Sequence, residues 1–84
     1  MEEQFYKMCA ANNVIGTIKS NVLLLACYEI GTRFTISRND VHASIEVTYE
    51  DLQYGGEKVL ERIFPELYRR LCETERMKRG KTFD

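Results

Sequence analysis

The sequence predicts a single α+β domain: a short N-terminal helix, a small antiparallel sheet and a long C-terminal helix packed on one face of that sheet. Apolar residues recur at a four-residue step through residues 57–78, which is typical of an amphipathic helix. Apolar and polar residues alternate through residues 41–49, which is typical of a half-buried strand. A chain of 84 residues with 44% hydrophobic and 30% charged residues suits one modest core. No repeat or linker divides residues 1–84, so one domain is expected.

The N-terminal helix is expected over residues 2–11. Phe5 and Cys9 fall on one face at helical spacing. Two asparagines at positions 12–13 follow directly, and asparagine often ends a helix because it tolerates a left-handed backbone. The next piece, residues 14–18, is either a short strand or the tail of this helix.

A hairpin over about residues 33–49 is the clearest prediction for the sheet. Both 33–37 and 41–49 alternate between apolar and polar side chains. Asn39 and Asp40 lie between them and tolerate the backbone dihedrals of a turn.

The stretch NVLLLACYEI at positions 21–30 is compatible with two structures. As a strand over 22–30 it would be buried on both faces and would turn at Gly31 to pair with residues 33–38. As a helix it would begin after Ser20 and end at Gly31. Because Val, Tyr and Ile favour strands, a further strand over 22–30 is the preferred interpretation.

The C-terminal helix is expected over about residues 57–78 with a kink at Pro65. The apolar pairs keep their step on both sides of the proline, which predicts one helix rather than two. Proline removes one backbone hydrogen bond, but Pro65 falls on the polar side, where water can replace that bond. A capping pattern begins at Thr48, and two glycines at 55–56 precede the long helix, so a separate helical turn is expected over 50–54.

Composition argues against several classes of protein. The formal net charge of −1 gives no general attraction to nucleic acid or to an anionic membrane. The longest apolar run, residues 22–27, is too short to span a bilayer, and the acidic N-terminus lacks the basic region of a signal peptide. Three widely spaced cysteines, Cys9, Cys27 and Cys72, indicate buried free thiols in a reducing compartment. A cytoplasmic protein is expected, in the host cytoplasm if the chain is viral.

Candidate catalytic residues are weak. His42, Ser44 and Glu46 have the residue types of a nucleophile triad and share one face of the predicted strand. Same-face neighbours on a strand lie roughly 6.5 to 7 Å apart, too far for a direct bond between serine and histidine. The cysteines and His42 show no spacing typical of zinc ligands. We therefore expect no enzyme activity, no metal and no cofactor.

Charge and tyrosine placement suggest a binding surface. Residues 43–66 contain six acids and two bases, and a row of carboxylates can imitate a phosphate backbone, although a solvated face is the commoner explanation. Tyr54 lies beside the two glycines, where it cannot easily reach the core, and tyrosine is enriched at interfaces. The candidate partner-binding residues are Glu57, Glu61, Glu66 and Tyr54.

A basic segment gives the alternative. Residues 67–84 contain six bases and three acids, and Arg76, Lys78 and Arg79 are the candidate nucleic-acid contacts. Nucleic acid is not favoured, because no aromatic residues are interleaved with these bases.

The expected function is a small non-enzymatic regulator or inhibitor that binds a macromolecular protein partner, a class that includes phage proteins blocking a host or defence component. The alternatives are a nucleic-acid-associated protein and a small-ligand-binding oligomer. A core this small also favours self-association, most simply as a homodimer. No membrane association is expected.

Overall fold

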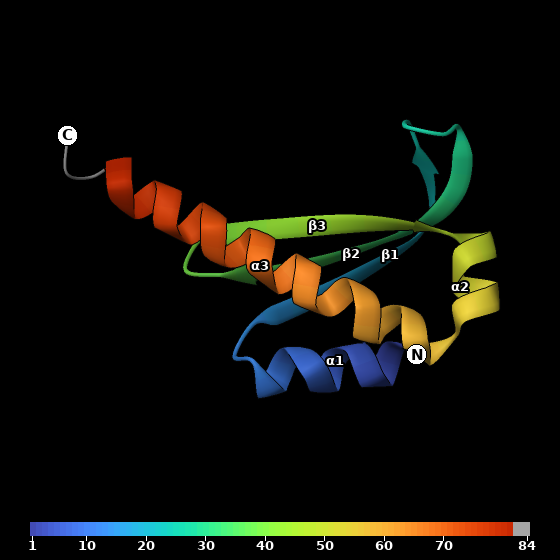
Figure 1. Cartoon of the computed structure of the whole chain (residues 1–84), viewed down its shortest axis with the longest axis horizontal. Coiled ribbons are helices and arrows are strands. Elements are labelled where there is room, and N and C mark those ends of the chain that lie inside the picture. Colours follow the sequence, from blue (N-terminus) through green and yellow to red (C-terminus); the bar gives the residue numbers. More distant parts are fainter. Residues whose placement is uncertain (82–84) are drawn as a thin grey trace.

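The computed structural model describes residues 1–81, with side chains described up to Lys78. Three strands form one antiparallel sheet in the order β1-β2-β3, and α1 and α3 cover the same face of it (Figure 1). The predicted α+β class and the arrangement of its helices are confirmed. The elements are α1 (Glu2–Ala11), β1 (Ile15–Leu24), β2 (Glu29–Arg38), β3 (Val41–Thr48), α2 (Tyr49–Gly55) and α3 (Glu57–Lys81).

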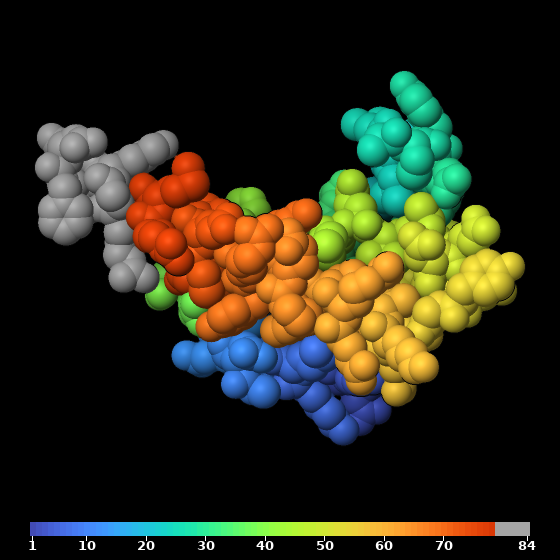
Figure 2. Space-filling model, viewed as in Figure 1, coloured from blue at the N-terminus to red at the C-terminus, as the bar shows by residue number. Residues whose placement is uncertain are grey.

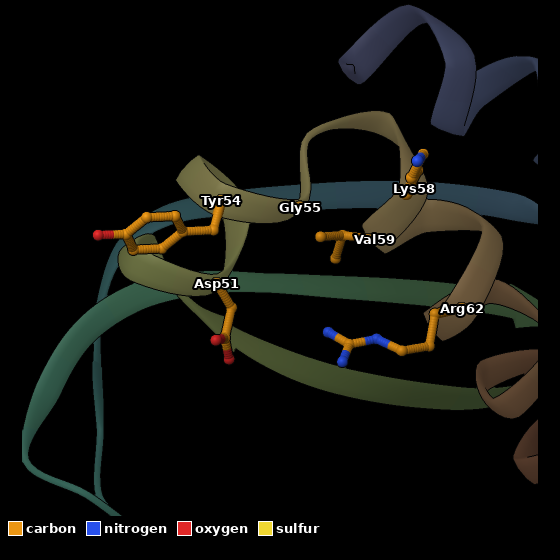
Figure 3. Close-up of a pocket in the computed structure, with 6 residues that line it drawn as sticks. All are labelled: Asp51, Tyr54, Gly55, Lys58, Val59 and Arg62. Atoms are coloured by element: carbon orange, nitrogen blue, oxygen red, sulfur yellow. The ribbon is translucent and has the colours of Figure 1, made fainter.

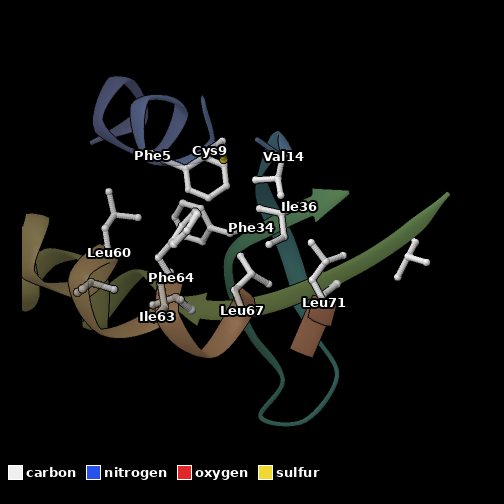
Figure 4. Packing of buried hydrophobic residues seen from close by; sticks show 14 residues of the cluster. Phe5, Cys9, Val14, Phe34, Ile36, Leu60, Ile63, Phe64, Leu67 and Leu71 are labelled. Atoms are coloured by element: carbon white, nitrogen blue, oxygen red, sulfur yellow. The ribbon is translucent and has the colours of Figure 1, made fainter. Parts of the chain in front are cut away.

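The core lies between the sheet and the two longer helices (Figure 4). Phe5 of α1 is fully buried, and its ring centroid lies 5.2 Å from that of Phe34 and 6.2 Å from that of Phe64. Gly16 of β1 lets α1 approach the sheet, because a Cβ there would lie only 2.5 Å from the Cys9 sulfur. The largest fully buried side chains are Phe5, Phe34, Ile36, Leu60, Leu67 and Leu71.

The hairpin of β2 and β3 is confirmed. Phe34 pairs with Ile45 and places its ring in the core. Asn39 and Asp40 have φ angles of 53° and 63°, and a two-residue turn with both residues at positive φ matches the twist of the flanking strands. The strand ends at Thr48, so Tyr49, expected inside the hairpin, instead begins α2.

The prediction of a single strand over 22–30 is wrong. These residues form the end of β1, a turn over 25–28 and the start of β2. Tyr28 adopts a φ of 55° and its backbone N–H donates to the Leu24 carbonyl at 2.8 Å, which closes the turn. Gly31, expected at the turn, lies inside β2. The turn contains no Gly, Pro, Asn or Asp, so the sequence carries none of the usual signals for it.

We call residues 22–30 the arm, because this outer part of the β1–β2 hairpin extends past β3 (Figure 1). The register of β1 shifts between Lys19 and Val22, and a bulge of this kind bends a strand. Leu24 then packs back over Gly31, where a Cβ would lie 2.7 Å from the Leu24 side chain. The same Cβ would lie 2.4 Å from the Val47 carbonyl oxygen, so only glycine permits this close approach of β2 and β3.

The C-terminal part of the chain forms the short helix and the separate long helix that the sequence predicted. Thr48 caps α2 by accepting a hydrogen bond from the Asp51 N–H at 3.2 Å. Gly56, with a φ of 54°, separates α2 from α3. The longer helix runs without interruption through the exposed Pro65 and reaches Lys81, three residues beyond the predicted end. One continuous helix is therefore confirmed, whereas the kink stays a prediction.

Candidate functional site

The corner between α2 and α3 displays Tyr54. Helix α2 has seven residues and none of them is fully buried, although Leu52 packs, partly buried, against the core. Tyr54 is 86% exposed, as the sequence predicted for a residue beside two glycines. Gly55 lets the first turn of α3 come close, because a Cβ there would lie 2.2 Å from the Val59 side chain. The backbone therefore fixes Tyr54 at the corner while its ring remains in solvent.

A surface pocket of about 350 Å³ lies behind this ring, between α2 and the first two turns of α3. Its polar lining carries both signs of charge, from Asp51 on one side and from Lys58 and Arg62 on the other. Figure 3 shows the Arg62 guanidinium extending toward Asp51, while Tyr54 points away from the pocket. Buried Val59 supplies the apolar part of the lining. The pocket is suited to a mixed polar and apolar protein side chain.

The three candidate acids do not share one side of α3. Glu57 and Glu61 are exposed and one turn apart. Glu66 lies five residues beyond Glu61, which is about 140° around a helix axis. The structure therefore places Glu57 and Glu61 at the same end of α3 as Tyr54, and Glu66 on a different side. Recognition through these residues stays a prediction.

The charge of Glu66 is already compensated within the helix. Its carboxylate accepts hydrogen bonds from Arg69 at 2.6 and 3.1 Å and from Arg70 at 3.2 Å. These bonds, with that from Arg69 contributing most, lower the pKa of Glu66 below its ordinary value. A partner that used Glu66 would have to compete with both arginines.

The basic candidates are also divided. Arg76 and Lys78 are exposed, but two residues on a helix are about 200° apart, so they project from nearly opposite sides of α3. The side chain of Arg79 lies outside the described residues. Nucleic-acid contact through this segment stays a prediction.

The polar residues considered for catalysis lie on the solvent face of the sheet. Ser44 shares a hydrogen bond with Thr35 at 2.9 Å, and Glu46 forms an ion pair with Arg33 at 2.9 Å. Both partners are cross-strand neighbours on β2. His42 is exposed on the same face. Among the described residues, no group of His, Cys, Asp and Glu is arranged to hold a metal ion.

Two expectations about burial are wrong. Cys9 is buried, and burial raises the pKa of its thiol, but Cys27 is exposed and Cys72 is only half-buried. Tyr28, which would be buried in a strand over 22–30 covered on both faces, is instead 82% exposed. Both Cys27 and Tyr28 belong to the turn of the arm, and a turn at the tip of a hairpin projects away from the core.

Sequence reasoning missed the arm as a surface. The apolar stretch at 21–30 predicts burial by composition, yet most of its large side chains face solvent. The sequence carries no turn signal at 25–28 to indicate that these residues leave the core, because that turn contains no Gly, Pro, Asn or Asp. The exposed apolar side chains of the arm are Leu23 at 48%, Leu25 at 75%, Tyr28 at 82% and Ile30 at 46%.

Comparisons of the chain with models of protein families, with curated proteins and with solved structures found no match. Within residues 1–81, no helix is both long enough and apolar enough to cross a membrane. Function must therefore be inferred from the surfaces described above.

Proposed function

We propose that this chain acts by binding another protein, through the surface formed by α2 and the first turns of α3. The observation that carries the proposal is Tyr54, which is 86% exposed on a capped helix that has no fully buried residue. Tyrosine is enriched at protein interfaces because its ring buries a large area and its hydroxyl can still form a hydrogen bond. The mixed pocket beside it offers a second anchoring point.

The mode of action that fits this surface is occupation of a partner rather than chemistry. Glu57 and Glu61 add negative charge next to Tyr54, which favours a partner with a basic patch and speeds association with it. A basic cleft that normally holds nucleic acid is one such patch, so the chain would be a regulator or inhibitor working in the cytoplasm. A phage protein that blocks a host or defence component would act in this way.

The test begins with the tagged chain as bait in its source cells, followed by reconstitution with the purified partner. Tyr54→Ala should weaken binding at least tenfold by titration calorimetry, because it removes the ring. Tyr54→Phe keeps the ring and should stay within about threefold. Both variants should melt like the wild type, since Tyr54 is outside the core. Unchanged affinity in Tyr54→Ala would refute the proposed surface.

Charge-reversal variants distinguish the contribution of Glu57 and Glu61 to binding from that of Glu66. Changing Glu57 and Glu61 together to Lys should slow association, and more so at low salt, where charges are less screened. Glu66→Lys is the matched control, because the arginines already compensate the carboxylate that it removes. Equal effects of the two changes would contradict the placement of the binding surface at the start of α3.

The same preparation tests the two alternatives. If nuclease treatment removes everything that the bait captures, and if changing Arg76, Lys78 and Arg79 to Glu abolishes a gel shift, the chain binds nucleic acid instead. Native mass spectrometry of the purified chain would reveal a bound small ligand. Either result would displace protein binding as the function.

A further inference from the structure

Two exposed apolar features flank β3, and neither belongs to the surface proposed above. At its C-terminal end stands the arm, with Leu25 and Tyr28 mostly in solvent. At its N-terminal end is a second pocket, of about 440 Å³, between the start of β3 and α3. We call it the Met77 pocket; its lining residues are Asp40, Val41, His42, Thr74, Met77 and Lys78. Met77 is 68% exposed.

The arm and the Met77 pocket lie at opposite ends of a hollow. Figure 2 shows that hollow between the arm and the C-terminal half of α3. In Figure 1 the arm rises beside the C-terminal end of β3. The helix α3 passes the N-terminal end of β3. β3 is an edge strand of the sheet, and it runs from the Met77 pocket to the arm.

We propose that the chain forms a homodimer in which the arm of each copy packs into the Met77 pocket of the other. A twofold axis through the hollow, beside the middle of β3, would place the arm of each copy at the Met77 pocket of the other, so both contacts would form at once. This is the isologous arrangement of a C2 dimer, in which one patch meets its complement on the partner twice.

The chemistry of the two features is complementary. The tip of the arm offers Leu25 and Tyr28, and the pocket offers the apolar side chains of Val41 and Met77. Glu29 is the single charged residue of the arm, whereas the pocket is lined by one base, Lys78, and one acid, Asp40, so the arm would place Glu29 on the Lys78 side. An acid beside a base at the rim would fix the orientation of the arm without burying an unpaired charge.

The base of the arm is held in place before any partner arrives. Asn21, in the bulge of β1, has a φ of 57° and donates its backbone N–H to the Tyr49 hydroxyl at 3.1 Å. That hydroxyl in turn donates to the Asn21 side-chain oxygen. A contact surface ordered in advance loses less entropy on association. A two-stranded ribbon is only marginally stable by itself, so packing on a second copy would also stabilise the arm.

Sedimentation equilibrium of the wild-type chain tests the dimer directly. The expected mass is twice 9.8 kDa at high concentration, falling toward 9.8 kDa on dilution. Leu25→Ser in the arm and Met77→Glu in the pocket should each raise the dimer dissociation constant at least tenfold. Both positions are mostly exposed, so both variants should fold. A wild-type monomer at every concentration up to millimolar would overturn the proposal.

Mixing the two variants distinguishes exchange from other dimers. In a mixed pair, the intact arm of the Met77→Glu chain can enter the intact pocket of the Leu25→Ser chain. One of the two contacts is restored, so mixed dimers should form at concentrations where neither variant dimerises alone. Arms that packed against each other would give no such rescue, and the absence of rescue would refute the exchange.

Cys27 supplies a positional test, because it is exposed in the turn of the arm. Met77→Cys should give a covalent dimer under mild oxidation, and adding Cys27→Ser should abolish it. A wild-type dimer linked through two Cys27 residues at the same rate would show arms meeting each other and would overturn the proposal. Tyr54→Ala is the control for independence: it should remain a dimer, since protein binding and self-association use different surfaces.

Discussion

Arg38 and Glu75 form a two-point ion pair that joins the end of β2 to the C-terminal half of α3. Arg38 donates from Nη2 to one Glu75 oxygen at 2.8 Å and from Nε to the other at 3.2 Å. The same guanidinium donates to the Tyr68 hydroxyl at 3.0 Å and to the Asn12 carbonyl, just after α1, at 3.3 Å. Hydrogen bonding to Glu75 raises the pKa of Arg38 further above its ordinary value, so the charge is permanent. One side chain thus connects β2, α3 and the segment that follows α1.

Arg38→Met should destabilise the fold by about 3 kcal/mol, because it leaves the mostly buried Glu75 carboxylate without this partner. Chemical denaturation followed by circular dichroism measures the change. Arg33→Met is the matched control: its ion pair with Glu46 is more than one-third exposed on both sides and should contribute less than about 1 kcal/mol. Equal losses in the two variants would show that Arg38 has no special role.

The sequence predicted the elements better than the contacts between them. Local spacing identifies α1, the β2–β3 hairpin and α3, because each has a period that a short window detects. Arg38 and Glu75 are 37 residues apart, and no periodicity connects an arginine at a strand end to a glutamate on a helix. The arm was missed for a different reason: its turn depends on Tyr28 at positive φ, a conformation that tyrosine rarely adopts.

In the candidate site, too, local sequence predicted some features, while others depend on how the elements pack. Tyr54 was predicted correctly as exposed because the neighbouring glycines leave its side chain no route to the core. The acids were grouped because they are close in the sequence. A helix turns by about 100° per residue, however, and this rotation places Glu61 and Glu66 on different sides of α3. The Met77 pocket was beyond sequence reasoning, since it forms only when α3 lies beside the start of β3.

Tyr49→Phe should loosen the arm while leaving the rest of the sheet unchanged. The hydroxyl both accepts from and donates to Asn21, and its loss leaves a left-handed residue without this support. Hydrogen exchange should accelerate for the amides of residues 22–30 and stay constant for the β2–β3 hairpin. The loss of global stability should be at most about 1 kcal/mol, because the bonds are exposed.

Tyr54→Phe is the control for that measurement, because it removes a hydroxyl from an 86% exposed side chain elsewhere on α2 and should not alter exchange in the arm. Faster exchange throughout the sheet in Tyr49→Phe would mean that the contact supports the whole fold. Unchanged exchange in the arm would mean that the bulge holds its shape without Tyr49.

Leu67→Ala and Phe64→Ala should each destabilise the protein by roughly 2 to 5 kcal/mol, because each leaves a cavity between α3 and the sheet. Leu67 is 0% and Phe64 4% exposed. In a domain of this size such a loss can prevent folding at 37 °C. Met77→Ala, on the same helix but 68% exposed, is the control and should change the melting temperature of the monomer little. Wild-type melting in both core variants would contradict the observed packing.

Pro65→Ala should be neutral or stabilising. The proline lies on the solvent side of a helix that continues from Glu57 to Lys81, so alanine can restore a backbone hydrogen bond to the Glu61 carbonyl. Helix propensity sets the upper limit of the gain at about 3 kcal/mol. Thermal and urea unfolding of the two proteins measure it.

Arg62→Pro calibrates that result, because it introduces a proline at another exposed position of the same helix. It should lower stability by about 3 kcal/mol, since it removes the bond to the Lys58 carbonyl and its ring clashes with that carbonyl. The two variants should therefore change stability in opposite directions, because the helix already accommodates a proline at position 65 but has an ordinary backbone hydrogen bond to lose at position 62. A marked fall in the melting temperature of Pro65→Ala would instead show that the proline shapes α3 to fit the sheet.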